Sequence, residues 1–342
     1  MFENWTREFY KESEYPVLLR QKKLMELSKP FKGLKILDNT PIFRNTLLKY
    51  ECLIASGAEL FIAVSPSLPH DEKIVGILEQ VGIPLVQIEK SNASFDIVLD
   101  CAGLCRKFTP KIGTVELTRS GVENYENAPF PVFVADSGEI KKIETSFGTG
   151  DGYFRAMKKF GYSSFLGSKI LVFGFGKVGS GIVHYALQYG ALVTVVADFS
   201  DGFPEKENEN VQFIHLKNYP EISCAIKNAD FIVSATGKKN ALAVDELELA
   251  LKETHAVLAN MGVEDEYGAQ VSDSRVLFNK KPLNFSLEEP TQMKFMDATM
   301  ALHNALGKIL LDSKELSLGI NPLPLQLEEE ILEITRKYGN VF

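Results

Sequence analysis

Short apolar runs alternate with helix-periodic segments along the first part of the chain. The apolar runs predict strands at residues 34–37, 59–64, 85–88, 95–100 and 129–135. Helix-periodic segments follow the first and the second of these runs and predict helices at 41–55 and 70–81. Strands that alternate with helices form parallel sheets with right-handed crossovers. The pattern therefore predicts an α/β domain before residue 147.

The second part of the chain is organised around residues 169–198. An apolar run reaches the letters GFGKVG at 174–179, a helix-periodic segment follows, and a second apolar run ends on Asp198. This is the order strand, glycine turn, helix, strand. Later apolar runs predict three more strands, at 212–216, 230–234 and 256–260. The fold class is therefore α/β, with two doubly wound parallel sheets, and the glycine-rich passage 147–152 is a candidate hinge between them.

The glycine turn has the G-x-G-x-x-G spacing of dinucleotide-binding units. Its three glycines permit a tight turn, close approach of backbone to a pyrophosphate, and close packing of helix on strand. Free N–H groups at the start of the helix then face the phosphates. This predicts that a pyrophosphate is held by Gly174, Gly176, Lys177, Val178 and Gly179. The alternative is an empty Rossmann-like unit that is kept for packing.

Asp198 stands at the end of the second strand of this unit, 24 positions after Gly174. A carboxylate at that place accepts the ribose hydroxyls of NAD and repels the 2′-phosphate of NADP. We therefore expect NAD as the cofactor. The alternative is that Asp198 caps the turn that follows it, residues 199–202.

Composition narrows the classes of function. The chain has 342 residues, a net charge of −8 and 45% hydrophobic residues, which favours two domains and argues against a nucleic-acid surface. Apolar runs are too short to span a bilayer, and the first residues, MFENWTREFYKE, do not form a signal peptide. Four cysteines without a CxxC and scattered histidines predict neither disulfides nor a metal site. We expect a cytoplasmic protein with no membrane partner.

Polar residues follow two of the strands in the first part of the chain. Asp100 ends one strand, and the loop 116–121 contains Glu116 and Arg119. In open α/β sheets, ligands bind beyond the carboxyl ends of the strands, so these side chains are candidates for a substrate site. Helix caps or turns are the alternative role for each of them.

Taken together, these segments resemble the S-adenosylhomocysteine hydrolase family of NAD-dependent enzymes. The resemblance rests on the motifs FGTGDG, GFGKVGSG, VSATG, NMG and PLN, which occur here in the family's order. It implies a substrate domain at 1–147 and 292–342, and a Rossmann NAD-binding domain inserted at 148–291. It also implies a small-molecule substrate, closure by hinge motion and a homo-oligomer, either dimer or tetramer.

The resemblance extends the predicted cofactor site. Thr236 and Gly237 in VSATG would line the cofactor, and Met261 and Gly262 in NMG would flank its nicotinamide side. Asn284 in PLN would reach the nicotinamide carboxamide. The catalytic positions of the family, in contrast, fall here on Pro41, Cys101, Leu117, Ile140 and Val263. The chain is therefore expected to differ from the family at its catalytic positions.

Three functions follow from this combination. The first is a divergent NAD-dependent enzyme, an oxidoreductase, that uses hydride chemistry on a small polar metabolite of unknown identity. Its candidate catalytic residues are Asp100, Glu116, Arg119, Glu144 and His303. The second is a true S-adenosylhomocysteine hydrolase with relocated catalytic groups. The third is a non-catalytic NAD-binding regulatory or interaction subunit. For His303, packing within a helix is the alternative role.

Overall fold

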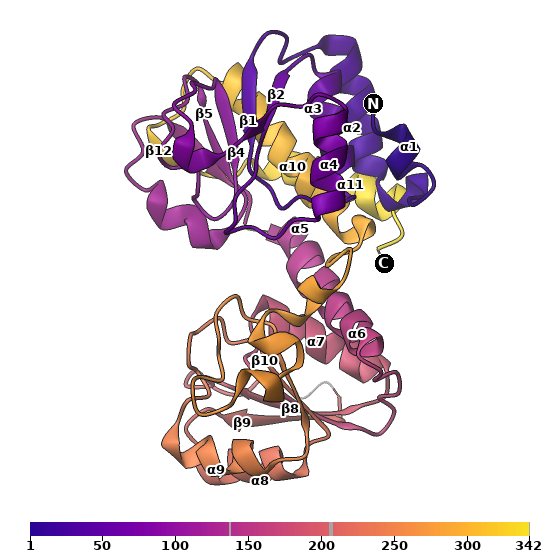
Figure 1. Ribbon diagram of the computed structural model, residues 1–342, viewed down its shortest axis with the longest axis vertical. Coiled ribbons are helices and arrows are strands. Elements are labelled where there is room, and N and C mark those ends of the chain that lie inside the picture. Colours follow the sequence, from indigo (N-terminus) through magenta and orange to yellow (C-terminus); the bar gives the residue numbers. More distant parts are fainter. Residues whose placement is uncertain (137, 205–207, 342) are drawn as a thin grey trace. The chain divides into compact units, whose positions relative to one another are not determined.

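The structure is a computed structural model that describes residues 1–136, 138–204 and 208–341. It contains two compact units (Figure 1). Unit 1 comprises Met1–Ile143 and the chain from Gln292 onward, and unit 2 comprises Glu144–Thr291. The chain therefore leaves unit 1, forms unit 2 and returns to unit 1.

Unit 1 is built on a seven-stranded sheet whose pairings are all parallel. Across the sheet the strands are β12 (Gly319–Asn321), β6 (Pro131–Val134), β5 (Gly113–Glu116), β4 (Ile97–Asp100), β1 (Lys35–Asp38), β2 (Glu59–Ala63) and β3 (Leu85–Val86). The sequence did not predict β5 and β12, because each is short and begins with a glycine. Both nevertheless complete the sheet, β12 as its edge.

Helices cover this sheet along its length. They are α1 (Glu3–Thr6), α2 (Pro16–Ser28), α3 (Thr46–Ala55), α4 (Glu72–Gln80), α5 (Gly138–Lys142), α10 (Met293–Asp312) and α11 (Leu325–Tyr338). α10 packs on β4, β5 and β6, and α2 and α11 pack on α10. The expected helix at 41–55 begins only at Thr46, because Ile42 forms an isolated bridge with His70.

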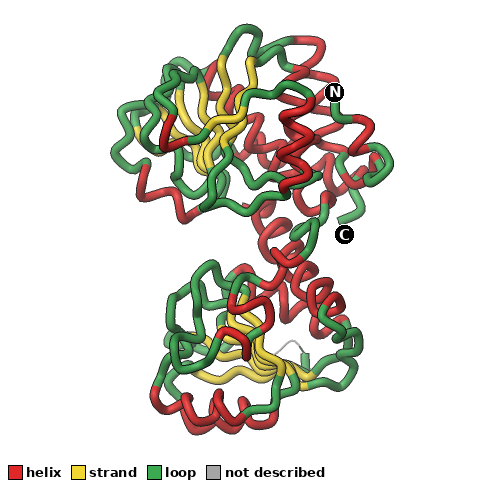
Figure 2. Tube along the Cα trace, in the orientation of Figure 1, coloured by secondary structure: helices red, strands yellow, loops and turns green. Residues whose placement is uncertain are grey.

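Unit 2 is built on a five-stranded parallel sheet (Figure 2). Its order is β11 (Val257–Asn260), β10 (Phe231–Ser234), β7 (Lys169–Phe173), β8 (Leu192–Ala197) and β9 (Val211–His215). The chain moves from β7 outward to β8 and β9, then returns to β10 on the other side of β7. The topological switch point therefore lies between β7 and β10, where doubly wound folds bind their ligands.

Both faces of the second sheet are covered by helices. α6 (Thr149–Lys159) and α7 (Lys177–Gln188) pack with one apolar cluster, which includes Val172, Val193 and Val195. α8 (Tyr219–Asn228) and α9 (Asp245–Glu253) pack with the other, which includes Leu171, Val196 and Ile232. Alternate residues of the strands thus point to opposite cores. The predicted fold class, two doubly wound parallel sheets with the Rossmann domain inserted, is confirmed.

The glycine-rich passage at 147–152 is helical. α5 continues through a π-helical segment, Ile143–Gly148, directly into α6. Its glycines serve close packing, since a Cβ built on Gly150 would lie 2.5 Å from the backbone of Gly181 in α7. A role of this passage as a hinge stays a prediction.

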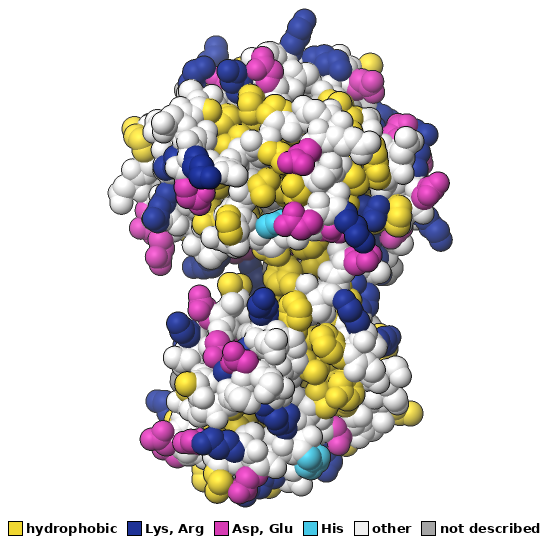
Figure 3. Space-filling view, viewed as in Figure 1, with side chains coloured by type: hydrophobic (Ala, Val, Ile, Leu, Met, Phe, Trp, Pro, Cys, Tyr) yellow, Lys and Arg dark blue, Asp and Glu magenta, His cyan; other side chains and the backbone are white. Residues whose placement is uncertain are grey.

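The surface carries charges of both signs. Lys and Arg side chains intermingle with Asp and Glu side chains on the face shown in Figure 3, in keeping with a modest net charge of −8. Among the described residues, no helix combines the length and apolar character that crossing a bilayer requires.

Candidate functional site

The glycine turn of unit 2 joins β7 to α7. Gly174 has a φ of 98°, which a residue with a Cβ rarely adopts. A Cβ on Gly174 would also clash with the carbonyl oxygen of Ala235, and one on Gly179 would clash with the carbonyl oxygen of Gly174. Glycine at these two positions therefore lets the turn pack closely on the residue that follows β10 and on its own backbone.

Gly176 differs from Gly174 and Gly179, the other two glycines of the motif. It precedes the first residue of α7 with ordinary extended backbone, φ −76°, and a Cβ built on it would meet no atom within 4 Å. Neither packing within the described residues nor backbone conformation therefore requires a glycine here. An open approach to free N–H groups at a helix start is the feature that a pyrophosphate needs. The residues present thus fit a dinucleotide, with Lys177 exposed and Val178 partly buried beside them.

The turn after β10 forms the other side of the switch point. Thr236 donates from its backbone N–H and its hydroxyl to Oε2 of Glu266, at 2.9 and 2.8 Å, and Gly237 donates its N–H to Oε1 at 2.7 Å. Glu266 is fully buried, and burial raises the pKa of its carboxyl group. No sequence motif singles out Glu266. The structure shows that it fixes the Thr236–Gly237 turn next to Gly174.

Asp198 lies directly after β8 with an exposed carboxylate. Its Oδ1 accepts bonds from the N–H and the hydroxyl of Ser200, at 3.1 and 2.5 Å, and Nε2 of His215 lies 3.5 Å away. These bonds to Ser200 lower the pKa of Asp198, and His215 contributes to the shift. Both expected roles are compatible with this geometry, since Oδ1 caps the turn and the exposed carboxylate can still receive a ribose.

The residues expected on the nicotinamide side follow β11 in the chain. Met261 donates its N–H to the Ser234 carbonyl at 2.8 Å, and Gly262 follows it. Asn284 is buried in a 3₁₀ turn, Leu283–Ser286. A Cβ on Gly152 of α6 would come within 3.2 Å of the Asn284 Cβ, so that glycine permits the close approach.

In unit 1, Asp100 and Glu116 are neighbours at the carboxyl ends of β4 and β5. Asp100 accepts bonds from the N–H groups of Cys101 and Cys105, from Asn39 and from the hydroxyl of Tyr125, at 2.5 to 2.9 Å. Glu116 accepts from the N–H groups of Ala102 and Gly103, both at 2.9 Å, and from Thr118. The two carboxyl groups thus hold the segment Cys101–Cys105, which has left-handed backbone at Ala102 and Gly103.

Burial dominates the protonation of both groups. It raises the pKa of Asp100, against the lowering effect of Tyr125 and Asn39. It raises the pKa of Glu116 to about 7, and the charge of Asp100 adds to that shift. Glu116 therefore titrates much closer to neutral pH than a free carboxyl group does. Arg119 is exposed at the start of the next 3₁₀ helix, Arg119–Asn124, and Glu144 is half-buried in unit 2.

His303 lies in the interior of unit 1, on α10. Its Nε2 donates to the Val115 carbonyl at 2.9 Å, and its Nδ1 has no partner among the described residues. Burial holds the pKa of His303 well below its usual range, and the positive charge of Lys49 lowers it further. The imidazole is therefore neutral, with a free lone pair on Nδ1. Its role in proton transfer stays a prediction.

Sequence reasoning missed three charged residues near these groups. Asp38, which ends β1, pairs with Lys49 of α3, and neither side chain is exposed. Burial lowers the pKa of Lys49. Lys141 of α5 is also buried and donates to the Leu117 carbonyl at 3.0 Å, just after β5. The signal for Lys49 was a charge within the apolar helical run LLKYECLI.

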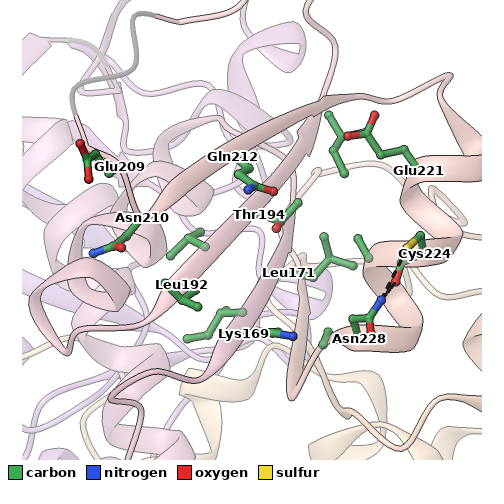
Figure 4. Close-up of a pocket in the computed structure, with 15 residues that line it drawn as sticks. Lys169, Leu171, Leu192, Thr194, Glu209, Asn210, Gln212, Glu221, Cys224 and Asn228 are labelled. Atoms are coloured by element: carbon green, nitrogen blue, oxygen red, sulfur yellow. Dashed lines mark hydrogen bonds between the residues drawn. The ribbon is translucent and has the colours of Figure 1, made fainter.

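A large cavity of unit 2 lies away from the glycine turn. It measures about 520 Å³ and lies between α8 and the first halves of β7, β8 and β9 (Figure 4). Lys169, Leu192 and Gln212 line it, and these residues stand near the amino ends of their strands. It is therefore a separate groove and not the place where a doubly wound sheet binds a dinucleotide. Among the residues that the structure describes, no cluster of His, Cys, Asp and Glu could hold a metal ion.

Comparisons with known proteins agree with this geometry. Residues 163–265 match the NAD_binding_7 family, described as "Putative NAD(P)-binding". The adenosylhomocysteinase of Thermoplasma acidophilum is 23% identical over 94% of this chain and 90% of its own. The S-inosyl-L-homocysteine hydrolase of Methanopyrus kandleri is 22% identical over 93% and 86%. A dipicolinate synthase subunit from Bacillus halodurans, 13% identical with a TM-score of 0.50, covers 83% of this chain and 99% of its own and shares the fold.

Fold, glycine turn and family match together define an NAD(P)-binding protein with two doubly wound α/β units. The curated relatives, which span most of both chains at low identity, make the class more specific. The chain is therefore similar to adenosylhomocysteinases, at 22–23% identity over nearly its whole length. The predicted resemblance and, at the level of an NAD(P)-binding domain, the predicted NAD cofactor are confirmed.

Proposed function

We propose that this protein is an NAD-dependent enzyme of the adenosylhomocysteinase-like group that uses hydride chemistry on a small polar metabolite. Bound NAD would accept a hydride from a carbon that bears a hydroxyl group, and the hydroxyl proton would pass to a protein base. Unit 2 binds the cofactor in this proposal, and the candidate acid–base groups are Asp100, Glu116, Arg119 and His303 of unit 1 and Glu144 of unit 2.

One observation carries the proposal: the open space at Gly176. The other two glycines of the motif are explained by a left-handed φ or by contacts with backbone, but a side chain at Gly176 would meet nothing in the described protein. Gly176 itself is exposed, directly before the first turn of α7. A pyrophosphate supplies the missing contact, with Asp198 on the β8 side of the switch point to receive a ribose.

On the side of the substrate, Glu116 is the candidate acid–base group with the most suitable pKa. A general base works best when its pKa lies near the operating pH, and burial brings the pKa of Glu116 to about 7. Lys141 is a second candidate, because its buried ammonium group lies at the carboxyl end of β5, where Glu116 also stands. Asp100, Arg119, Glu144 and His303 complete the proposed set.

The test follows the redox state of the cofactor. Purified protein is loaded with NAD and mixed with a panel of small hydroxylated metabolites, and NADH fluorescence is recorded. Adenosylhomocysteine and S-inosylhomocysteine belong in the panel, because the relatives are named for reactions on these compounds. Appearance of NADH with one member supports the proposal. Thiol release from either thioether instead identifies a hydrolase. NAD that stays oxidised across the panel contradicts hydride chemistry.

A second candidate function is an NAD-binding subunit without turnover. The observation that favours it is that the carboxylate oxygens of Asp100 and Glu116 already accept hydrogen bonds from backbone N–H groups of the Cys101–Cys105 segment. Such carboxylates stabilise a loop without performing chemistry. This candidate predicts NAD binding with no change in redox state, and a partner protein that copurifies with the chain.

We further propose a cytoplasmic homo-oligomer, as the resemblance implies. Sedimentation of the purified protein tests the oligomeric state. A dimer or tetramer at micromolar concentration is the expected result, and a stable monomer in the presence of NAD contradicts it.

A further inference from the structure

Three consecutive residues of unit 2 adopt left-handed backbone without being glycine. Phe278, Asn279 and Lys280 have φ values of 55°, 51° and 63°. Non-glycine residues reach this region rarely and usually singly, so a run of three is strained. Strain of this kind persists only where the surrounding structure imposes it, and it concentrates at functional sites.

The side chain of Lys280 helps to hold this strained backbone in place. The side chain is 6% exposed, and its ammonium group lies 3.0 Å from Oδ2 of Asp265 and 3.1 Å from Oδ1 of Asp273. It also donates to the carbonyl of Gly268 at 2.8 Å. A buried ammonium with three oxygen partners has its hydrogen-bonding capacity filled. The strained run is therefore held at its last residue.

Asn260, the last residue of β11, holds the same run through the backbone. Its Nδ2 donates to the carbonyls of Lys280, Gly262 and Glu264, at 2.6, 3.0 and 2.9 Å. Its Oδ1 accepts from the hydroxyl of Ser234, the last residue of β10, at 2.8 Å. We call Asn260, Asp265, Asp273 and Lys280 the Lys280 cluster. It links the ends of β10 and β11 to the chain that continues into Asn284.

The position of the Lys280 cluster relates it to one half of the cofactor. Asp198, at the end of β8, lies on one side of the glycine turn, and the ends of β10 and β11 lie on the other. A dinucleotide whose ribose is received at Asp198 and whose pyrophosphate lies at Gly176 must extend its other nucleotide beyond β10. Met261 and Gly262 directly follow β11, and Asn284 is four positions after Lys280.

We propose that Lys280 is a positioning residue for the nicotinamide half of the cofactor: its ammonium group, held by Asp265 and Asp273, fixes the strained run, which holds residues 261–262 through Asn260 and leads into Asn284. This inference rests on the proposed NAD-dependent function. Lys280 itself does not touch the cofactor. It acts through the backbone of the strained run and through Asn260.

The test compares NAD with ADP-ribose, which lacks the nicotinamide. Both ligands are titrated calorimetrically into the full-length wild type, Lys280→Met, Lys280→Arg and the control Lys281→Met. Lys281 is adjacent but exposed. Lys280→Met should bind ADP-ribose as the wild type does, while its preference for NAD over ADP-ribose falls about tenfold, the effect of one lost hydrogen bond to a polar ligand group. Lys280→Arg should restore part of that preference.

Other outcomes overturn the proposal. An unchanged preference in Lys280→Met, or an equal loss of both ligands, shows that Lys280 does not act on the nicotinamide half. If Lys280→Met does not fold, Asp273→Asn replaces it, because Asp273 is 75% exposed and its removal leaves the ammonium group in place. An unchanged preference in that variant also overturns the proposal. A wild type that binds neither ligand instead contradicts the NAD-dependent function itself.

Discussion

Asp100 and Glu116 lie opposite each other in the register of β4 and β5, and together they accept four backbone N–H groups from the single segment Cys101–Cys105. The segment can keep its left-handed residues, Ala102 and Gly103, because these carboxyl groups bind it from both strands. The charge of Asp100 also raises the pKa of Glu116. The stability of the Cys101–Cys105 segment therefore depends on the protonation of these two carboxyl groups, and so on pH.

The first prediction concerns that coupling. The pKa of Glu116 is raised from 4.5 to about 7, so the folded protein binds its proton more tightly than the unfolded chain does. The stabilising contribution is full below about pH 4.5 and is lost as pH rises through about 7. Its upper limit is about 3 kcal/mol. Urea unfolding of the wild type and Glu116→Gln across this range should show a difference in unfolding free energy that changes with pH.

Glu139→Gln is the matched control for this experiment. Glu139 is an exposed acid of α5 whose partner is Lys142, and its removal should leave the pH dependence of the wild type intact. The contradicting result is a difference in unfolding free energy between wild type and Glu116→Gln that stays constant from about pH 4.5 to about pH 8. It would show that Glu116 does not titrate in this window.

The second prediction concerns Asp297, a buried carboxyl group of α10. Its two oxygens accept the N–H groups of Val17 and Leu18, both at 2.9 Å, in the first turn of α2. Asp297→Ala should therefore lower the free energy of unfolding by about 2 kcal/mol, as loss of a buried helix cap does. NAD affinity should not change, because the contact lies within unit 1. Asp312→Ala, at the exposed end of α10, is the control; equal stabilities would exclude the capping role.

The third prediction concerns cofactor choice. Asp198→Asn keeps a side-chain oxygen for Ser200 but removes the negative charge that disfavours a 2′-phosphate. The ratio of NADP affinity to NAD affinity should rise several-fold, measured by fluorescence titration with the reduced forms. Asp201→Asn, three positions further along the same turn, should leave the ratio unchanged. A constant ratio in Asp198→Asn would assign Asp198 to the turn alone.

The sequence predicted the fold well because burial leaves a clear pattern in parallel sheets. β4, β7 and β10 are buried on both faces and stand out as uninterrupted apolar runs, and the glycine turn follows one of them directly. β5 and β12 were missed for the opposite reason. They are short and begin at Gly113 and Gly319, so their hydrogen bonds to neighbouring strands, and not their composition, define them.

The site was predictable only in part, because sequence reveals which groups are present but not what they bond to. Asp100 ends a strand as expected, but Glu116, expected in a loop, is the last residue of β5. The bonds of both to the Cys101–Cys105 segment depend on the register of β4 and β5. Glu266 and Lys280 carry no motif at all. Their importance comes from burial among backbone groups that are distant in sequence, such as the N–H of Gly237.

The most direct test of cofactor binding at the glycine turn is the affinity of Gly176→Val for NAD. The Cβ position of Gly176 is open and its φ of −76° suits any residue, so the variant should fold with wild-type thermal stability. Calorimetric titration should nevertheless show NAD binding at least about tenfold weaker than in the wild type, because the side chain fills the place of the pyrophosphate. Wild-type NAD affinity in Gly176→Val would contradict a cofactor bound at the glycine turn, and with it the proposed function.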